Sequence, residues 1–262
     1  MPTLPSESHQ AREIAESFGA DAERYDRARP SYPDAMVERI VAASPGVDFL
    51  DVGCGTGIAA RQFQAAGCRV LGVDVDARMA DQARQHGLAV EVSRFESWEP
   101  AGRTFDAVVA GQTWHWVDPV AGAAKAAEVL QPGGQLALFW NVFQPTPEVA
   151  EAFSEIQVRV LPEVPLNPWA VPVLDLYKGG FAKTAEGIRE TGAFGEPEQW
   201  QWEWQRLYTR DEWLDQLFTF GAMSQLPPAQ AAELRAAMGA AIDTMGGTFT
   251  MPYLTVVVTA AR

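Results

Sequence analysis

A short apolar segment that runs into three closely spaced glycines places the strongest constraint on the fold of this chain. Phe49–Val52 is followed at 53–57 by Gly-Cys-Gly-Thr-Gly, and a second apolar segment, 70–73, ends at Asp74. Glycine permits a sharp turn and the close approach of a ligand, because it carries no Cβ. A strand, a glycine-rich turn, a helix and a second strand that ends in a carboxylate are typical of a nucleoside-binding βαβ unit. The pattern therefore predicts an α/β fold with a nucleoside site at this turn.

Charge and hydrophobic content exclude several classes of protein. The 262 residues, 47% of them hydrophobic, suffice for one α/β domain with an additional segment. A net charge of −14 argues against binding of DNA or RNA through phosphates. No apolar stretch approaches the ~18 residues of a membrane span, and residues 1–12 lack the apolar segment of a secretory signal. We expect a cytoplasmic protein with no nucleic-acid or membrane partner, and the sequence leaves its oligomeric state open.

The two cysteines are a poor disulfide pair. Cys54 follows the first predicted strand, whereas Cys68 precedes the second, parallel strand. The two residues are therefore expected at opposite edges of the sheet, beyond the ~7 Å that a disulfide can span between Cα atoms. Free cysteines are typical of a cytosolic protein.

The N-terminal half divides into a predicted arm and a predicted core. Residues 1–33 form the arm or lid, helical over 8–27 and ended by two prolines. Residues 34–142 form the core, in which apolar strand patterns alternate with helical patterns. The predicted strands are 49–52, 69–73, 89–93, 105–110 and 135–140, and the predicted helices are 34–43, 57–66, 77–85 and 120–129.

The C-terminal half divides into an insertion and a segment that completes the core. Residues 143–198 are rich in proline and aromatic residues and form a predicted substrate-side insertion, with helices at 148–161 and 180–192. Residues 199–262 supply further helices and strands. Three tryptophans in this segment alternate with polar residues, which places them on one face of a strand. That face either packs on helices or forms an aromatic cage. The tryptophans are Trp200, Trp202 and Trp204.

Three motifs resemble those of a known enzyme family. The stretch 50–57, Leu-Asp-Val-Gly-Cys-Gly-Thr-Gly, resembles the first motif of class I S-adenosylmethionine (SAM) dependent methyltransferases. The segments Tyr25–Pro33 and Gln112–Asp118 are similar to the Y-x-x-x-R-P-x-Y-P and Q-x-x-H-W-x-D patterns of a small-molecule branch that contains the trans-aconitate methyltransferases. The resemblance implies a Rossmann-like, seven-stranded, mostly parallel sheet with helices on both faces and an antiparallel last strand.

The same resemblance implies SAM as the cofactor and S-adenosylhomocysteine (SAH) as its product. In the family, an acid after the second strand holds the ribose, and a backbone amide and a carboxylate after the third strand meet the adenine. Tyr25 and Arg29 are candidates for the methionyl carboxylate, because a guanidinium group matches a planar anion. The candidate cofactor-binding residues are Tyr25, Arg29, Asp51, Gly53, Gly55, Gly57, Asp74, Val75, Met79, Phe95, Glu96 and Gln112.

The segment after the fourth predicted strand is the candidate substrate region, because α/β sheets bind ligands where their strand order reverses. Trp114, His115 and Trp116 of this segment and Trp169 of the insertion are the candidate substrate-binding residues. His115 is also the candidate catalytic residue. Its role stays open among a general base, a group that orients the substrate and a structural hydrogen bond in the loop. The scattered histidines and cysteines lack metal-ligand spacing, so no metal is expected.

We therefore predict a SAM-dependent methyltransferase that acts on a small molecule, at an oxygen or carboxylate. Carbon and nitrogen acceptors stay open. A non-catalytic SAM-binding regulator is one alternative. A nucleotide-dependent oxidoreductase is another, against which the Gly-x-Gly-x-Gly spacing argues, because dehydrogenases use Gly-x-Gly-x-x-Gly.

Overall fold

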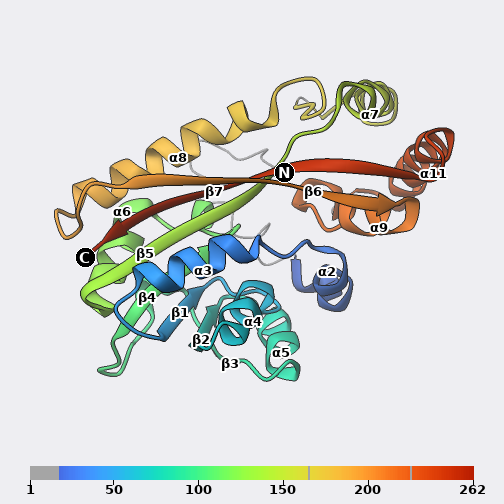
Figure 1. Cartoon of the computed structure of the whole chain (residues 1–262). Helices are drawn as coiled ribbons and strands as arrows, with labels where there is room; N and C mark the ends of the chain where they lie inside the picture. Colours follow the sequence, from blue (N-terminus) through green and yellow to red (C-terminus); the bar gives the residue numbers. More distant parts are fainter. Residues whose placement is uncertain (1–17, 165, 225) are drawn as a thin grey trace.

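One seven-stranded sheet forms the framework of the protein (Figure 1). The computed structural model describes residues 18–164, 166–224 and 226–262. The strands follow the order β3-β2-β1-β4-β5-β7-β6. They are β1 (Asp48–Val52), β2 (Arg69–Asp74), β3 (Ala89–Val92), β4 (Phe105–Gly111), β5 (Leu130–Phe143), β6 (Glu198–Thr209) and β7 (Thr248–Ala261). The five strands from β3 to β5 are parallel, and β7 is antiparallel to both β5 and β6. This topology confirms the Rossmann-like sheet with an antiparallel last strand.

Helices cover both faces of the sheet (Figure 1). The helices α3, α4 and α5 pack on one face, and α6 and α8 pack side by side on the other. The described helices are α2 (Ala22–Ala28), α3 (Asp34–Ala43), α4 (Ile58–Ala65), α5 (Ala77–Gln85), α6 (Pro119–Val129), α7 (Pro147–Val160), α8 (Val173–Glu190), α9 (Arg210–Leu217), α10 (Gly221–Ser224) and α11 (Pro228–Thr244). Because both faces of β4 are covered, its first six residues are all buried. Five of the six are apolar, and the sixth, Asp106, accepts a hydrogen bond from the Asp48 N–H.

The strand order reverses between β1 and β4. The chain passes from β3 at one edge back to β4, which pairs with β1 on the side opposite β2. The glycine-rich turn 53–57 follows β1 and the segment 112–118 follows β4, so both loops lie at the same edge of the sheet. Open α/β sheets bind ligands in the crevice at this point.

The last three strands extend beyond the others, and aromatic residues of the core gather at their far end. Strands β5 and β7 have 14 residues each, and α7, α9 and α11 gather at their far end (Figure 1). Phe153 is central to this cluster: its ring centroid lies 5.1 Å from Trp169, 6.0 Å from Trp213 and 5.6 Å from Phe249. Trp169 is only 4% exposed. The structure therefore places this candidate substrate residue within the aromatic cluster.

The predicted insertion 143–198 contributes to two regions. Helix α7 packs beside α11 in the aromatic cluster, whereas α8 packs on α6, β5 and β7. Helix α8 begins at Val173, earlier than the predicted start at residue 180. The pair Gly179–Gly180 disfavours a helix locally, and packing of buried side chains such as Phe181 and Ile188 outweighs this cost.

The three alternating tryptophans of β6 pack against the body of the protein. Trp200 and Trp202 pack on the cluster that includes α3, where the Arg39 guanidinium lies 4.2 Å from the Trp200 ring centroid. Trp204 stacks on Tyr253 and donates its indole N–H to Thr255. All three are half-buried. The alternation of tryptophan with polar residues along β6 is therefore explained by packing of one face of the strand against the protein.

Two further expectations concern the arm and the cysteines. Of the arm helix expected over 8–27, the structure describes a 3₁₀ turn at Phe18–Asp21 and α2, and residues 8–17 lie outside the described residues. Cys54 and Cys68 are both buried and free. Within the described parts of the chain, none of the helices has both the length and the apolar character needed to cross a membrane.

Candidate active site at the ends of β1 and β4

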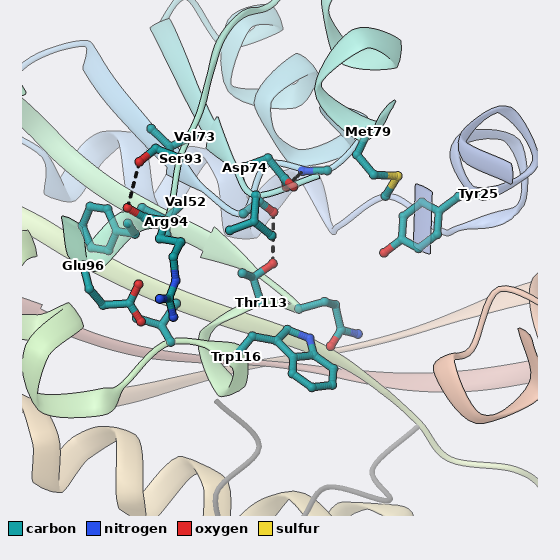
Figure 2. A pocket seen from close by; sticks show the side chains of 16 residues that line it. Tyr25, Val52, Val73, Asp74, Met79, Ser93, Arg94, Glu96, Thr113 and Trp116 are labelled. Carbon is teal, nitrogen blue, oxygen red and sulfur yellow. Dashed lines mark hydrogen bonds between the residues drawn. The ribbon is translucent and has the colours of Figure 1, made fainter. Parts of the chain in front are cut away.

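A pocket opens at the carboxyl ends of β1, β2 and β4 (Figure 2). It encloses about 930 Å³ of space, including its open mouth. Tyr25 and Met79 line one end, and Arg94 and Glu96 line the other (Figure 2). The candidate residues in its wall are Tyr25, Gly53, Gly55, Asp74, Val75, Met79, Phe95, Glu96, Gln112 and Trp116. The remaining candidates, Arg29, Asp51, Gly57, Trp114, His115 and Trp169, lie outside this lining.

The glycine-rich turn is held open by contacts with the β4 loop. Gly53 has φ +62°, and a Cβ there would collide with the Thr113 side chain. The Thr113 hydroxyl lies 3.0 Å from the Gly53 carbonyl oxygen, to which it donates a hydrogen bond. Thr113 also lines the pocket, although no sequence signal distinguishes it. Position 53 therefore requires glycine for two reasons: its φ is positive, and the Thr113 side chain leaves no room for a Cβ.

Asp74 connects β2 to the glycine-rich turn. Its Oδ2 accepts a 2.7 Å hydrogen bond from the Gly55 N–H, and its Oδ1 accepts a 2.9 Å bond from the Asp76 N–H. The residue is 9% exposed, and burial raises the pKa of its carboxyl above the usual value although these N–H donors lower it. Each oxygen retains acceptor capacity toward the pocket, because a carboxylate oxygen carries two lone pairs.

Asp51 is a buried acid with little compensation. It is 1% exposed, and among the described residues only the Ala60 N–H approaches its carboxylate, outside ordinary hydrogen-bond geometry. Burial, together with the nearby Asp74 carboxylate, raises the pKa of Asp51 to about 8. Burial of an unpaired carboxylate is costly, so this position favours either a proton or a cationic partner.

The turn after β3 is joined to the β4 loop through Glu96. Its Oε1 accepts a 3.2 Å hydrogen bond from the Asp118 N–H. Phe95 is 3% exposed, and its ring centroid lies 6.1 Å from that of Trp114. Trp114 is itself 1% exposed. The structure thus places Trp114 in the core below the loop, whereas Trp116 lines the pocket.

His115 is oriented by a neighbouring indole. The Trp140 Nε1–H donates to His115 Nδ1 over 3.4 Å, and the His115 and Trp116 rings lie 4.8 Å apart. An indole N–H only donates, so the neutral imidazole carries its proton on Nε2. Burial lowers the pKa of His115 to about 3. The ring is therefore neutral throughout the physiological pH range and presents Nε2–H as a donor.

Tyr25 and Arg29 of the arm are in contact with each other, but only one of them lines the pocket. Tyr25 lines the pocket, whereas the Arg29 guanidinium lies between the rings of Tyr25, at 4.8 Å, and Phe220, at 4.6 Å. Arg29 Nη2 donates to the Thr219 carbonyl oxygen over 2.8 Å. The arm is therefore anchored to the segment after α9 by the residue that was expected to reach the cofactor.

Gly57 begins a helix. Its φ of +86° makes it the N-cap of α4, which positions the end of the glycine-rich turn. Within the described ranges, no group of three or more histidine, cysteine or acidic side chains is arranged to hold a metal ion.

Comparisons with known proteins agree with this arrangement. Residues 50–138 match the profile of a methyltransferase domain. An uncharacterized methyltransferase of Mycobacterium tuberculosis is 36% identical over 50% of this chain and 54% of its own length. A malonyl-[acyl-carrier protein] O-methyltransferase of Enterobacter lignolyticus is 29% identical over 60% of this chain and 63% of its own length. The chain thus spans about half to two thirds of the length of these two relatives.

A solved structure extends the likeness to almost the whole fold. The structure of a putative type II methyltransferase from Anaeromyxobacter dehalogenans has a TM-score of 0.61 and 24% identity. The match covers 89% of this chain and 97% of that chain. Apart from Tyr25, the residues that line the pocket lie within residues 50–138, which match the methyltransferase domain.

Proposed function

We propose that this chain, a class I SAM-dependent methyltransferase by its domain and fold, transfers the methyl group of SAM to a small-molecule acceptor. The observation that carries the proposal is the pocket at the strand-order reversal. There, the Asp74 carboxylate and a glycine-rich turn lie in the wall, with the poorly compensated Asp51 carboxylate beside them. A nucleoside with a cationic side chain satisfies all three features.

The lining residues fit the two halves of SAM. Val75 and Met79 supply apolar surface for an adenosine, and Glu96 supplies an acceptor for its exocyclic amine. Asp74 is the acceptor for ribose hydroxyls. Asp51 lies outside the pocket lining, so the ammonium of the methionyl group would compensate its charge through space, from the pocket side of the wall. Each assignment matches a group of SAM with a protein side chain of complementary chemistry.

The bound cofactor supplies an electrophilic methyl group. The protein residues must align the acceptor with it and exclude water, since both effects lower the barrier of a displacement reaction. We assign the exclusion of water to the arm, where Tyr25 forms one end of the pocket. The arm, residues 1–33, is proposed as the lid over the core 34–142, with 143–198 on the substrate side and 199–262 completing the sheet.

We propose an oxygen or carboxylate acceptor. Curated relatives of this chain include the malonyl-[acyl-carrier protein] O-methyltransferase above and a ubiquinone biosynthesis O-methyltransferase of Hahella chejuensis. A carboxylate is already ionised at neutral pH, so its methylation needs no base. This suits a site whose only nearby histidine among the described residues is His115, with a pKa lowered to about 3. Nitrogen and carbon acceptors are the alternatives.

The cofactor assignment predicts that SAM and SAH bind one to one. Titration calorimetry with SAH measures the stoichiometry, and NADH in the same cell is the control that addresses an oxidoreductase. SAM incubated with a panel of carboxylic acids, phenols and amines then measures the release of SAH. Binding of SAH without turnover of any acceptor would favour the non-catalytic regulator. Absence of SAH binding would contradict the proposal.

For His115 we expect an orienting role. Because Nδ1 accepts from Trp140, the neutral imidazole can act on an acceptor molecule only as a hydrogen-bond donor, through Nε2–H. His115→Ala is expected to raise KM about 10-fold, the effect of losing one hydrogen bond of ~1.4 kcal/mol, with kcat within about 3-fold. His115→Asn should recover part of this KM. Turnover should show no inflection between pH 5 and 8 from this group, since its pKa is lowered to about 3.

Trp140→Phe tests the same assignment from the opposite side. It removes the donor to Nδ1, so the imidazole can adopt the other tautomer, and KM is again expected to rise while SAH affinity is unchanged. A wild-type rate that falls below pH 7, and loses this fall in His115→Asn, would instead assign a general base.

A further inference from the structure

We propose that a second site, in a groove beside the described part of the arm (residues 18–33), binds a phosphate-sized dianion and thereby holds this part of the arm against the pocket. The groove lies between the arm, α4 and β6, and encloses about 720 Å³ including its open mouth. Three arginines from these three segments line it: Arg29, Arg61 and Arg206. The inference rests on the proposed function in one respect, namely that the pocket on the other side of the arm binds SAM.

Most of the guanidinium donors in this groove are not used by the protein. Arg29 makes the one hydrogen bond to Thr219, and its buried Nε has no partner among the described residues. The polar contacts of Arg206 are long: Nη1 lies 3.5 Å from the Ala28 carbonyl oxygen, and Nη2 lies 4.0 Å from a Glu212 oxygen. Its guanidinium carbon also lies 4.5 Å from the Tyr208 ring centroid, a contact that leaves the N–H donors unused. A guanidinium carries five N–H donors in a planar fork that matches phosphate and carboxylate oxygens. The groove therefore offers donors for an anion with several oxygens.

The charge of the groove is opposite to that of the whole protein. Asp26 is the one acid in its lining, and it is paired with Arg61 at 2.8 Å and with His86 Nε2 at 3.1 Å. Three guanidinium groups against the carboxylates of Asp26 and, outside the lining, Glu212 leave the groove cationic, whereas the chain carries a net charge of −14. Clustering of like charges is unfavourable without a counter-ion. A bound dianion removes this cost.

The groove is connected to the cofactor pocket through two residues. The Arg29 guanidinium lies 4.8 Å from the ring centroid of Tyr25, which forms one end of that pocket. Arg61 Nη1 donates over 2.9 Å to the carbonyl oxygen of Thr56 in the glycine-rich turn. An anion that bridges Arg29 and Arg206 joins the arm to β6. The arm then stays over the pocket, and cofactor and anion each raise the affinity of the other.

The test measures SAH affinity by calorimetry in chloride buffer and in phosphate buffer of equal ionic strength. For the wild type, 10 mM phosphate is expected to lower the Kd of SAH about 3- to 10-fold, a coupling of the usual size. Arg206→Gln should abolish this effect while leaving the Kd in chloride within about 2-fold. Arg39→Gln, which makes the same charge change at an exposed site on α3, should retain the effect.

Other probes identify the anion and keep the two proposals separate. Glycerol phosphate in place of inorganic phosphate asks whether a phosphate monoester enters the groove, and malonate asks whether a dicarboxylate does. An effect that persists in Arg206→Gln, or equal SAH affinity in phosphate and chloride, would overturn the anion site and leave the methyltransferase assignment standing. Arg206→Lys keeps the charge but loses the planar fork, so phosphate should still lower the Kd of SAH, by less than in the wild type. This variant distinguishes loss of the anion site from a folding defect caused by substitution at position 206. Failure of SAH to bind in any buffer would instead overturn the proposed function.

Discussion

Replacement of Asp74 by alanine is expected to weaken SAH binding about 5- to 150-fold, which corresponds to ~1–3 kcal/mol. Two losses contribute. The ribose hydroxyls lose a charged acceptor, and the Gly55 N–H, which now donates to Asp74 Oδ2 over 2.7 Å, is left without its partner. The second loss loosens the glycine-rich turn, so part of the effect is expected in the stability of the protein without ligand.

Asp74→Asn separates these contributions. One amide oxygen can still accept from a backbone N–H, but the amide NH₂ cannot accept from a second, so SAH affinity should lie between those of wild type and Asp74→Ala. Asp81→Asn makes the same charge change on the exposed surface of α5, where Asp81 pairs with Arg84, and should leave SAH affinity unchanged. Calorimetry at one pH and salt concentration measures all four proteins. Unchanged affinity in Asp74→Ala would remove the ribose assignment.

The parts of the site that the sequence predicts are those set by local backbone geometry. Gly53 and Gly55 both have positive φ, and Asp74 ends its strand at the glycine-rich turn, as the motif indicates. The turn after β3 and the loop after β4 also reach the same pocket, since parallel strands deliver their carboxyl ends to one edge of the sheet. That these loops reach the pocket follows from strand order alone.

The parts that the sequence did not predict depend on packing between distant segments. Trp169 is an aromatic residue in the predicted substrate-side insertion and was therefore a candidate for ligand binding, but its ring packs in the aromatic cluster around Phe153. Arg29 carries the right charge for a carboxylate, and the partner it reaches is the Thr219 carbonyl, 190 residues further along the chain. Thr113 has no distinguishing sequence signal, although its hydroxyl holds the Gly53 carbonyl. Side-chain direction at these positions is fixed by tertiary contacts.

Helix boundaries show the same division. At the start of α9 the sequence Thr209-x-x-Glu212 is a capping box, a local signal for a helix start, and in the structure each residue bonds the other's backbone. The start of α8 is not marked, because Gly179–Gly180 interrupts its pattern while the helix is held by packing on the sheet. Local sequence signals predict a helix start where side chains of the same segment cap the backbone. They fail where burial of side chains against the sheet outweighs an unfavourable local sequence.

Asp51→Asn is expected to stabilise the protein without ligand at alkaline pH and to weaken cofactor binding. Burial raises the pKa of Asp51 to about 8, above the usual unfolded value of about 3.9. The folded state therefore retains a proton that the unfolded chain releases, so stability falls as pH rises from about 4 to about 8 and is level above. Asparagine has no charge to desolvate, and the difference between variant and wild type should grow over this pH range.

At pH 8.5 the gain in the free energy of unfolding is expected to be on the order of 2 kcal/mol. The full shift in pKa sets an upper limit of about 5 kcal/mol, and the unpartnered amide of asparagine offsets part of it. Thermal or urea unfolding of both proteins from pH 5 to 9 measures this difference, from which the other titrating groups cancel. Asp106→Asn is the control, because Asp106 is similarly buried but accepts a 2.9 Å hydrogen bond from the Asp48 N–H.

The same carboxyl links protons to the cofactor. If the ammonium of SAH compensates Asp51, binding favours the ionised carboxylate, and at pH 7 the wild type must release protons when SAH binds. Calorimetry in two buffers of different ionisation enthalpy counts these protons, and Asp51→Asn should release none while binding SAH about 10-fold or more weakly, a loss of ~1.4 kcal/mol or more. Equal proton release in both proteins, with equal SAH affinity, would show that the buried carboxylate of Asp51 serves the sheet and not the ligand.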